Sequence, residues 1–352
     1  MGKKVYIATN NGDMGGGEVM LLHLARALRS LGKSVTIIGP AQPAELLEAA
    51  ADEGFSTLVL PAQDRKSYMA QLRLWRGRNR KELLWCNGLV PSLATAGLGP
   101  RIVHLHQLPT GGQKLAAKIA RRGALLTLVP SAFMAERVAG STVLENWVPE
   151  VAKPLQSTTQ DRSTLAVGFL GRVSEIKGTD LLADAIYQLN QQQKDIHFKL
   201  LIGGEARFVK EGAQNRVEEA LARLGDDLVT LGWVEPEDFF AQVDCLAMPS
   251  QWDEPFGLVA AEAMSAKVPL LVTNSGALPS IVGEGYPWLA QRGSSQSIAD
   301  TLMDISSHLL TSSETLEEVV SRNYWRWYEN YSPESGKARV SQIIDNVEGL
   351  NK

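Results

Sequence analysis

Residues 250–264 have the sequence SQWDEPFGLVAAEAM and follow an apolar run at 243–248. The apolar run predicts a buried strand, and the pattern after Gly257 predicts a helix. A proline and a glycine should hold the intervening turn open. Glu254 is then expected on the loop and Glu262 about one turn inside the helix. Strand, turn and helix in this order form one unit of an α/β fold.

The two glutamates would flank free backbone N–H groups at the helix N-terminus. Such amides suit a phosphate, and the carboxylates suit hydroxyl groups, so a phosphorylated and polyhydroxylated ligand fits. The alternative is that both side chains merely favour the positive end of the helix dipole. One glutamate would fit that alternative best, whereas two favour a functional site.

Short apolar segments alternate with helical patterns along both halves of the chain. This alternation predicts right-handed βαβ units, two parallel sheets and ligands at the carboxyl ends of the strands. A polar, weakly patterned segment at 149–164 predicts a linker between the halves. The expected strands are 4–8, 34–38, 57–60, 82–86, 101–105 and 125–130 in the first half, and 165–170, 198–202, 229–231, 243–248 and 269–272 in the second.

The composition predicts a soluble globular chain of two domains. It has 352 residues, of which 44% are hydrophobic and 21% are charged. No apolar stretch approaches the ~20 residues of a membrane helix, and the first residues lead directly into a strand, unlike a signal peptide. Cys86 and Cys245 lie in apolar runs, which favours buried thiols in a reducing cytoplasm. The scattered histidines and cysteines form no zinc-type cluster.

Charge is divided unevenly, with +8 on residues 1–160 and −12 on the remainder. Tyr68, Leu72 and Trp75 recur at helical spacing among basic residues, a pattern typical of a helix bound to a membrane surface. A solvated helix face is the alternative, and no motif for nucleic acid accompanies the pattern. The residues predicted to face a membrane or acceptor are Arg73, Trp75, Arg76, Arg80, Lys114, Lys118 and Arg121.

Two loops carry phosphate-binding chemistry. Arg172 and Lys177 lie between glycines after the first strand of the second half, where they could clamp a diphosphate. Gly15, Gly16 and Gly17 follow the first strand of the chain and permit close approach to a phosphate or sugar, although a turn without a ligand is equally compatible. Their spacing departs from the dinucleotide fingerprint, which argues against a nicotinamide oxidoreductase.

Two other strand ends carry candidate side chains. His104 and His106 should point to one face, where either could reach a ligand. Gly232 and Trp233 end another predicted strand, where the backbone could border a nucleobase, and Trp233 could equally belong to the core.

Together these motifs resemble the retaining GT-B glycosyltransferases, specifically glycosyltransferase family 4. The resemblance spans nearly the whole chain, and the glutamate pair with the Arg–Lys loop is its most specific part. It rests on Gly15-Gly16-Gly17-Glu18, His106, Pro130-Ser131, Asn146-Trp147-Val148, Gly171-Arg172 with Lys177-Gly178, Ile202-Gly203-Gly204, Leu231-Gly232-Trp233, Pro249-Ser250, Glu254-Pro255-Phe256-Gly257 and Glu262-Ala263-Met264. The chain departs from the family at Lys267, where a glycine usually precedes Val-Pro.

The resemblance implies two facing Rossmann-like, doubly wound domains with a cleft between them. Residues 1–155 would form the acceptor domain, residues 160–332 the donor domain, and a helix at 335–352 would cross back to the first. The implied catalytic residues are His106, Glu254, Arg172 and Lys177. The implied donor-binding residues are Gly15, Gly16, Gly17, Arg172, Lys177, Gly203, Gly232, Trp233, Val234, Glu254, Pro255, Phe256, Gly257, Leu258 and Glu262.

The implied reaction moves a hexosyl unit from a UDP- or GDP-sugar to a lipid-linked or lipopolysaccharide-type acceptor, with retention of configuration. We expect no cofactor and no metal, because the chain lacks an Asp-x-Asp pair. We expect no nucleic acid partner, and a cytoplasmic location with peripheral association at the inner leaflet of the membrane. The alternatives are a transferase with a soluble acceptor and a non-catalytic subunit that binds nucleotide sugars.

Overall fold

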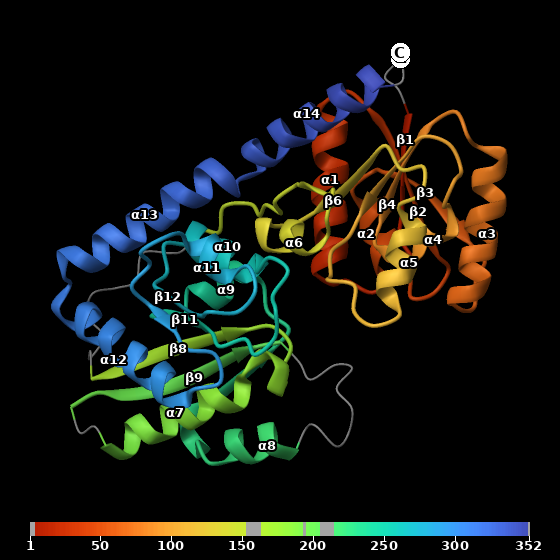
Figure 1. Ribbon diagram of the computed structural model, residues 1–352. Coiled ribbons are helices and arrows are strands. Elements are labelled where there is room, and N and C mark those ends of the chain that lie inside the picture. The colour runs from red at the N-terminus through yellow and green to blue at the C-terminus, as the bar shows by residue number, and fades with distance from the viewer. Residues whose placement is uncertain (1–3, 153–162, 193–194, 205–214, 351–352) are drawn as a thin grey trace. The chain divides into compact units, whose positions relative to one another are not determined.

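The computed structural model describes residues 4–152, 163–192, 195–204 and 215–350. The chain divides into two compact units, one formed by Met1–Trp147 with Pro333–Lys352 and the other by Val148–Ser332 (Figure 1). The first unit thus ends at Trp147, earlier than the expected residue 155, and takes in the end of the chain. Most of the predicted linker, residues 153–162, lies outside the described residues.

The first unit contains one parallel sheet of seven strands in the order β3-β2-β1-β4-β5-β6-β7. Its order reverses between β1 and β4, which makes that place the topological switch point where such sheets bind ligands. All six predicted strands are present, and the short β7 was not predicted. The strands are β1 (Lys4–Ala8), β2 (Ser34–Pro40), β3 (Ser56–Leu60), β4 (Leu83–Asn87), β5 (Arg101–His104), β6 (Leu126–Val129) and β7 (Thr142–Val143).

Helices cover this first sheet. Helix α1 packs against α14, which is the only part of the chain after residue 332 that the structure describes. Helices α3, α4 and α5 pack one beside the next. The helices of the unit are α1 (Gly16–Ser30), α2 (Glu45–Asp52), α3 (Arg65–Arg78), α4 (Leu89–Ala94), α5 (Gln113–Ala120), α6 (Ala132–Arg137) and α14 (Pro333–Leu350).

The second unit repeats this architecture with a parallel sheet of six strands in the order β10-β9-β8-β11-β12-β13. Its order reverses between β8 and β11, so it has a switch point of its own. The strands are β8 (Thr164–Leu170), β9 (His197–Gly203), β10 (Leu228–Gly232), β11 (Cys245–Met248), β12 (Leu270–Thr273) and β13 (Leu289–Ala290). The helices are α7 (Thr179–Gln192), α8 (Asn215–Ala222), α9 (Pro236–Phe240), α10 (Leu258–Ser265), α11 (Leu278–Val282), α12 (Ser295–Thr311) and α13 (Glu314–Asn330).

The two sheets confirm the predicted α/β class with two Rossmann-like units. Their central strands are buried on both faces, as the unbroken apolar runs indicated. Cys86 and Cys245 are buried cysteines outside any disulfide, as predicted. Across the part of the chain that the structure describes, no helix has both the length and the apolar character needed to cross a bilayer.

The structure corrects the prediction that Arg76 faces a membrane. Its side chain is fully buried, and its guanidinium donates to the carbonyl oxygens of Leu98, Glu82 and Pro100 at 2.7 to 2.9 Å. A buried guanidinium requires such acceptors, and here they tie α3 to the segments that lead into β4 and β5. Trp75 is half-buried and meets the ring of Tyr6 edge-on at 4.8 Å, so it belongs mainly to the packing of α3 on the sheet.

Gly336 allows α14 to pack closely against Trp147, the last residue of the first unit's N-terminal segment. A Cβ at this position would lie 2.2 Å from the Trp147 ring, whose backbone oxygen is bonded to the His23 imidazole at 2.8 Å. We predict that Gly336→Ala destabilises the protein by roughly 1–3 kcal/mol through overpacking, measured by urea unfolding. Gly77→Ala in α3 is the matched control, because nothing lies within 4 Å of its added Cβ. An equal effect of both substitutions would contradict this account of α14.

Candidate functional site

A pocket of about 230 Å3 lies at the switch point of the second sheet. The loops that leave β8 and β11 form its walls, and the start of α10 closes it. Its lining combines apolar strand ends with two cations and one carboxylate. The lining residues are Phe169, Leu170, Gly171, Arg172, Lys177, Ala247, Met248, Ser250, Glu254, Gly257 and Val259. The structure therefore brings the predicted Arg–Lys loop and the first glutamate together.

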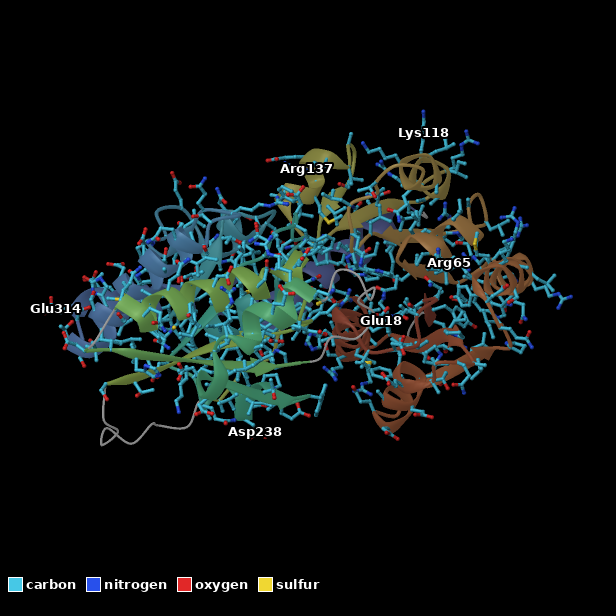
Figure 2. All side chains as sticks on the ribbon, turned by 90° about the horizontal axis from the view of Figure 1, so that it is seen from below. Glu18, Arg65, Lys118, Arg137, Asp238 and Glu314 are labelled. Atoms are coloured by element: carbon cyan, nitrogen blue, oxygen red, sulfur yellow. The ribbon has the colours of Figure 1, made fainter. Side chains whose placement is uncertain are left out.

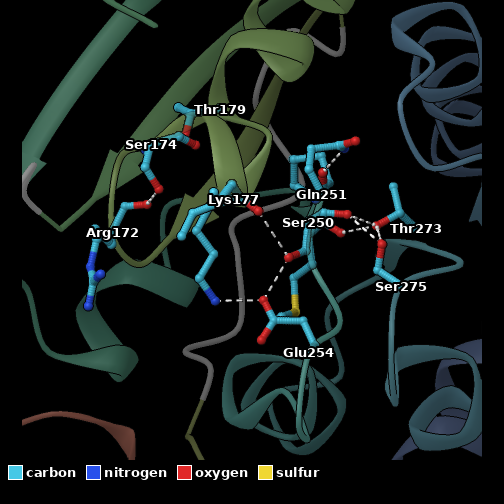
Figure 3. A network of polar contacts seen from close by, with 12 residues as sticks. Arg172, Ser174, Lys177, Thr179, Ser250, Gln251, Glu254, Thr273 and Ser275 are labelled. Carbon is cyan, nitrogen blue, oxygen red and sulfur yellow. Dashed lines mark hydrogen bonds and ion pairs between the residues drawn. The ribbon is translucent and has the colours of Figure 1, made fainter. Parts of the chain in front are cut away.

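Glu254 and Lys177 form an ion pair inside this pocket (Figure 3). The Lys177 ammonium lies 2.6 Å from Glu254 Oε1, and the Ser250 hydroxyl donates to the same oxygen at 2.7 Å. The glutamate is 5% exposed, and these two partners offset the cost of burying its carboxylate. The sequence placed both charges in one site, but their direct pairing was not predicted.

The loop after β12 holds the glutamate segment in place. The hydroxyls of Thr273 and Ser275 both donate to the backbone oxygen of Ser250, at 2.8 and 2.5 Å, and Ala277 N–H donates to the backbone oxygen of Glu254 at 2.8 Å. Thr273 and Ser275 carry no motif that could have marked them from the sequence. They act on the site only through the backbone that they bind.

Gly276 lets this loop approach closely. It has a φ of +58°, and a Cβ there would lie 2.2 Å from the backbone nitrogen of Glu254. Glycine adopts this conformation without strain, and only a residue without a Cβ leaves that space. The position of Glu254 is therefore fixed by backbone contacts on one side and by the ion pair on the other.

Helix α10 begins as the sequence predicted. Gly257 is its N-cap at a φ of +111°, Glu254 precedes the helix and Glu262 lies inside it. Phe256 is buried and meets Tyr331 edge-on at 5.3 Å, so its side chain anchors the turn and its backbone remains at the helix start. Burial, and secondarily the charge of Glu237, raises the pKa of Glu262 to about 7.

The loops that follow β8, β9 and β10 are hydrogen-bonded in series. Gly171 N–H donates to Gly203 at 2.8 Å, and Gly204 N–H donates to Gly232 at 2.7 Å. A Cβ on Gly203 would lie 2.8 Å from Val234 Cγ1. This edge of the sheet thus continues from the pocket toward β10.

Trp233 follows β10 on this edge. Its side chain is 73% exposed, so the alternative that it belongs to the core is wrong. Its indole is available to a ligand.

The remaining predicted residues gather at the switch point of the first sheet. Gly15 is the N-cap of α1, and a Cβ on Gly17 would lie 3.7 Å from the His106 ring. Asn87, at the end of β4, donates from Nδ2 to the Gly17 oxygen at 3.1 Å and accepts from His106 Nε2 at 2.6 Å. Burial lowers the pKa of His106 to about 4, so the imidazole is neutral at neutral pH.

Asn87 was not singled out from the sequence, where no motif surrounds it. Its position could have identified it, because a polar residue at the end of a central strand, opposite the glycine turn, lies where such sheets bind ligands. His104 is buried, with its ring centroid 4.1 Å from that of His106, so the two rings share a face as predicted. The predicted site residues therefore form one group in each unit.

The predicted membrane-facing residues differ in exposure to solvent. Arg121 is partly buried and donates to Thr127 and to the Ala139 oxygen. Two leucines among the basic residues, Leu74 at 57% and Leu115 at 65% exposure, were not predicted. The exposed predicted residues together with these two leucines are called the α3–α5 basic surface: Arg73, Leu74, Arg80, Lys114, Leu115 and Lys118. Figure 2 labels Lys118 on α5.

We predict that the Lys177–Glu254 pair is strongly coupled in stability. Lys177→Ala should lower the free energy of unfolding by about 2 kcal/mol, because it removes a partner from a buried carboxylate. Glu254→Gln in the same chain should restore much of that loss, because the amide carries no charge. A double-mutant cycle by urea unfolding measures the coupling. Strictly additive effects would contradict the pairing.

Comparison with known proteins places the second unit in a family. Residues 164–308 match the family model described as glycosyl transferases group 1. A lipopolysaccharide 1,2-N-acetylglucosaminetransferase of Salmonella typhimurium is 30% identical over 51% of this chain and 47% of its own length. A D-inositol 3-phosphate glycosyltransferase of Streptomyces avermitilis is 25% identical over 78% of this chain and 71% of its own length. The chain spans less than half the length of several curated relatives that it matches.

Among solved structures, Anabaena Alr3699/HepE in complex with UDP-glucose superposes with a TM-score of 0.81 at 20% identity, over 97% of this chain and 99% of its own. At this identity the likeness concerns the fold alone, which is the GT-B fold with two Rossmann-like units that the motifs implied. In sequence, residues 164–308 of the second unit match the group 1 glycosyl transferases.

Proposed function

We propose that this chain is a retaining glycosyltransferase of family 4. It would move a hexosyl unit from a UDP- or GDP-sugar to a lipid-linked or lipopolysaccharide-type acceptor. The observation that carries the proposal is the pocket in which Arg172, Lys177 and Glu254 meet the N-terminus of α10. A nucleotide sugar presents both a diphosphate and a ring of hydroxyls, and this pocket holds a partner for each.

The group transfer needs no protein nucleophile under this proposal. The acceptor oxygen forms a bond to the anomeric carbon on the face from which the diphosphate leaves, and the bond between that carbon and the diphosphate oxygen breaks. The acceptor proton passes to the departing phosphate oxygen. Lys177, Arg172 and the α10 amides would stabilise the negative charge that develops there. Because these groups supply positive charge at the leaving oxygen, we propose that the reaction requires no metal.

Donor binding would exchange the partners of the ion pair. Lys177 would leave Glu254 for a phosphate oxygen, and Glu254 would turn its acceptor oxygens to the sugar hydroxyls. Both charges are already held in the pocket by the pair and by Ser250, so little reorganisation is needed. A polar ligand that satisfies only one of the two charges would leave the other unpaired, which favours a complete nucleotide sugar.

The other predicted contacts fit the same donor. Glu262 would accept from the ribose hydroxyls, and the exposed Trp233 with Val234 would border the base. In the first unit, the neutral His106 would contact the donor sugar near the reacting carbon, and Gly16 would approach the diphosphate. The side-chain oxygen of Asn87 accepts the hydrogen on His106 Nε2, which leaves His106 Nδ1 as an acceptor.

We propose that the acceptor is presented at the inner leaflet of the cytoplasmic membrane. The α3–α5 basic surface would meet anionic lipid, and its two leucines would enter the interface. The lipopolysaccharide-related name of one relative supports a glycan acceptor of this kind. A soluble acceptor and a non-catalytic, donor-binding role are the alternatives.

Nucleotide binding tests the proposal. UDP, GDP or ADP and their sugars would be screened by thermal shift with and without EDTA, and a ligand at 100 times its Kd should add about 2.7 kcal/mol of stability. One nucleotide class should stabilise the wild type and Lys337→Ala, a control in α14, but fail to stabilise Lys177→Ala. The absence of any shift, or a shift that EDTA removes, would count against a metal-independent transferase. Binding without sugar transfer would favour the non-catalytic alternative.

The pH dependence of binding tests Glu262. The pKa of this carboxyl is about 7, so its ionised form, which accepts from ribose hydroxyls, grows as pH rises. Affinity for the nucleoside diphosphate should therefore increase between about pH 6 and about pH 8. Glu262→Gln is the control, because the ligand phosphate titrates identically against it. Parallel profiles of wild type and variant in calorimetry would exclude this role.

Liposome sedimentation tests the membrane contact. The double variant Lys114→Glu/Lys118→Glu should weaken binding to phosphatidylglycerol vesicles by about 1 kcal/mol or more per charge, and high salt should do the same. Arg137→Glu, an exposed charge on α6, should bind like the wild type. If the double variant sediments unchanged with vesicles and its nucleotide binding is intact, a soluble acceptor is the better hypothesis.

A further inference from the structure

Lys267 adopts a backbone conformation that disfavours a side chain. It lies between α10 and β12 with a φ of +56°, and it stands where the resembled family usually has a glycine. A lysine there is strained by the contact between Cβ and the following backbone. Strain at a non-glycine residue is a reason to look for a function of its side chain.

The Lys267 side chain reaches helix α13. Its ammonium lies 4.3 Å from the ring centroid of Tyr324, over the ring face. The Tyr324 hydroxyl in turn donates to Glu150 Oε1 at 2.9 Å. Lys267 and Glu150 are both exposed, so a cation, a phenol and a carboxylate lie together at the surface of the second unit.

Exposed aromatic rings continue from this group along α13. The rings of Tyr324 and Trp325 lie 5.7 Å apart, and Trp325 and Tyr328 meet edge-on at the same distance. Trp325 is 55% and Tyr328 49% exposed. The next ring, Trp327, is buried and donates to the Val148 oxygen at 3.2 Å, which fixes the helix beneath. We call Tyr324, Trp325 and Tyr328, with Lys267 and Glu150 at their edge, the α13 aromatic platform.

We propose that the α13 aromatic platform binds a saccharide chain at a site separate from the donor pocket. The C–H groups of a pyranose ring would pack on the faces of Trp325 and Tyr328, whose negative π-density attracts them as it attracts a cation. Lys267 and Glu150 would donate to and accept from the sugar hydroxyls. The proposal rests on the proposed transferase function only for the source of the saccharide, which would be the acceptor or product glycan.

The charge around the platform favours a neutral saccharide over a lipid surface. Exposed tryptophan and tyrosine also occur at membrane interfaces, but there basic residues accompany them. Two exposed cations, Arg322 on α13 and Lys267 at the edge of the platform, are present here as well, but exposed carboxylates that anionic lipid would repel outnumber them on α13. These carboxylates are Glu314, Glu317, Glu318 and Glu329.

Affinity electrophoresis tests the platform without a nucleotide. The protein would migrate through native gels containing dextran, mannan, galactomannan or a β-glucan. At least one polysaccharide should retard the wild type and Leu289→Ala, a control that trims an exposed leucine on β13. Trp325→Ala/Tyr328→Ala should lose most of that retardation. No retardation in any of the four gels, or equal retardation of the double variant, would overturn the proposal.

Lys267→Gly separates binding from folding. Glycine relieves the strained φ, so the melting temperature should rise or stay unchanged while retardation weakens at least threefold. Nucleotide-induced thermal shifts of all platform variants should equal those of the wild type, so a failed donor site and a failed platform give different results. The saccharide proposal would be refuted if no gel retarded the wild type and only the double variant failed to sediment with vesicles. That result would assign the platform to a bilayer.

Discussion

In each unit, a parallel sheet directs every strand's carboxyl end to one edge, and the strand order reverses once. The loops on either side of that reversal diverge, so each sheet creates one place where side chains from distant segments can meet. At the second sheet, this place joins the loop after β8 to the loop after β11, which lie 77 residues apart at Lys177 and Glu254. The candidate site thus follows from sheet topology before any particular side chain is considered.

The ion pair formed there has one role in the stability of the fold and another in the proposed binding of the donor. A buried carboxylate needs a partner, so Lys177 and Ser250 stabilise the fold by satisfying Glu254. The same lysine and carboxylate are the groups that a diphosphate and a sugar would require. In our account the pair holds both charges in position until the donor replaces it. The backbone contacts from Ser275 and Gly276 would keep the loop in place during that exchange.

Much of the fold was predictable because its signals are local. Apolar runs marked the central strands, and Gly257 marked the start of α10. The site was predictable to the level of which loops carry it. The direct pairing of Lys177 with Glu254 was not, because neither sequence spacing nor residue type specifies a contact between distant loops. The roles of Asn87 and Ser275 were not predicted, for the same reason.

The error at Arg76 has a related physical cause. A basic residue on an amphipathic pattern usually faces solvent, but backbone carbonyls from the segment after α3 and from the remote segment before β5 converge on this guanidinium and make its burial favourable. Lys267 was noted as a departure from the family, yet only the backbone conformation and the ring beneath its ammonium indicate what the lysine contacts. Convergence of distant groups is what a single sequence leaves undetermined.

The most direct test of the exchange is a crystal structure of the wild-type chain with an intact nucleotide sugar. Our account predicts that the Lys177 ammonium leaves Glu254 and binds a phosphate oxygen, while the Glu254 carboxylate accepts from sugar hydroxyls at the N-terminus of α10. A donor bound elsewhere, with the Lys177–Glu254 distance still near 2.6 Å, would contradict the account.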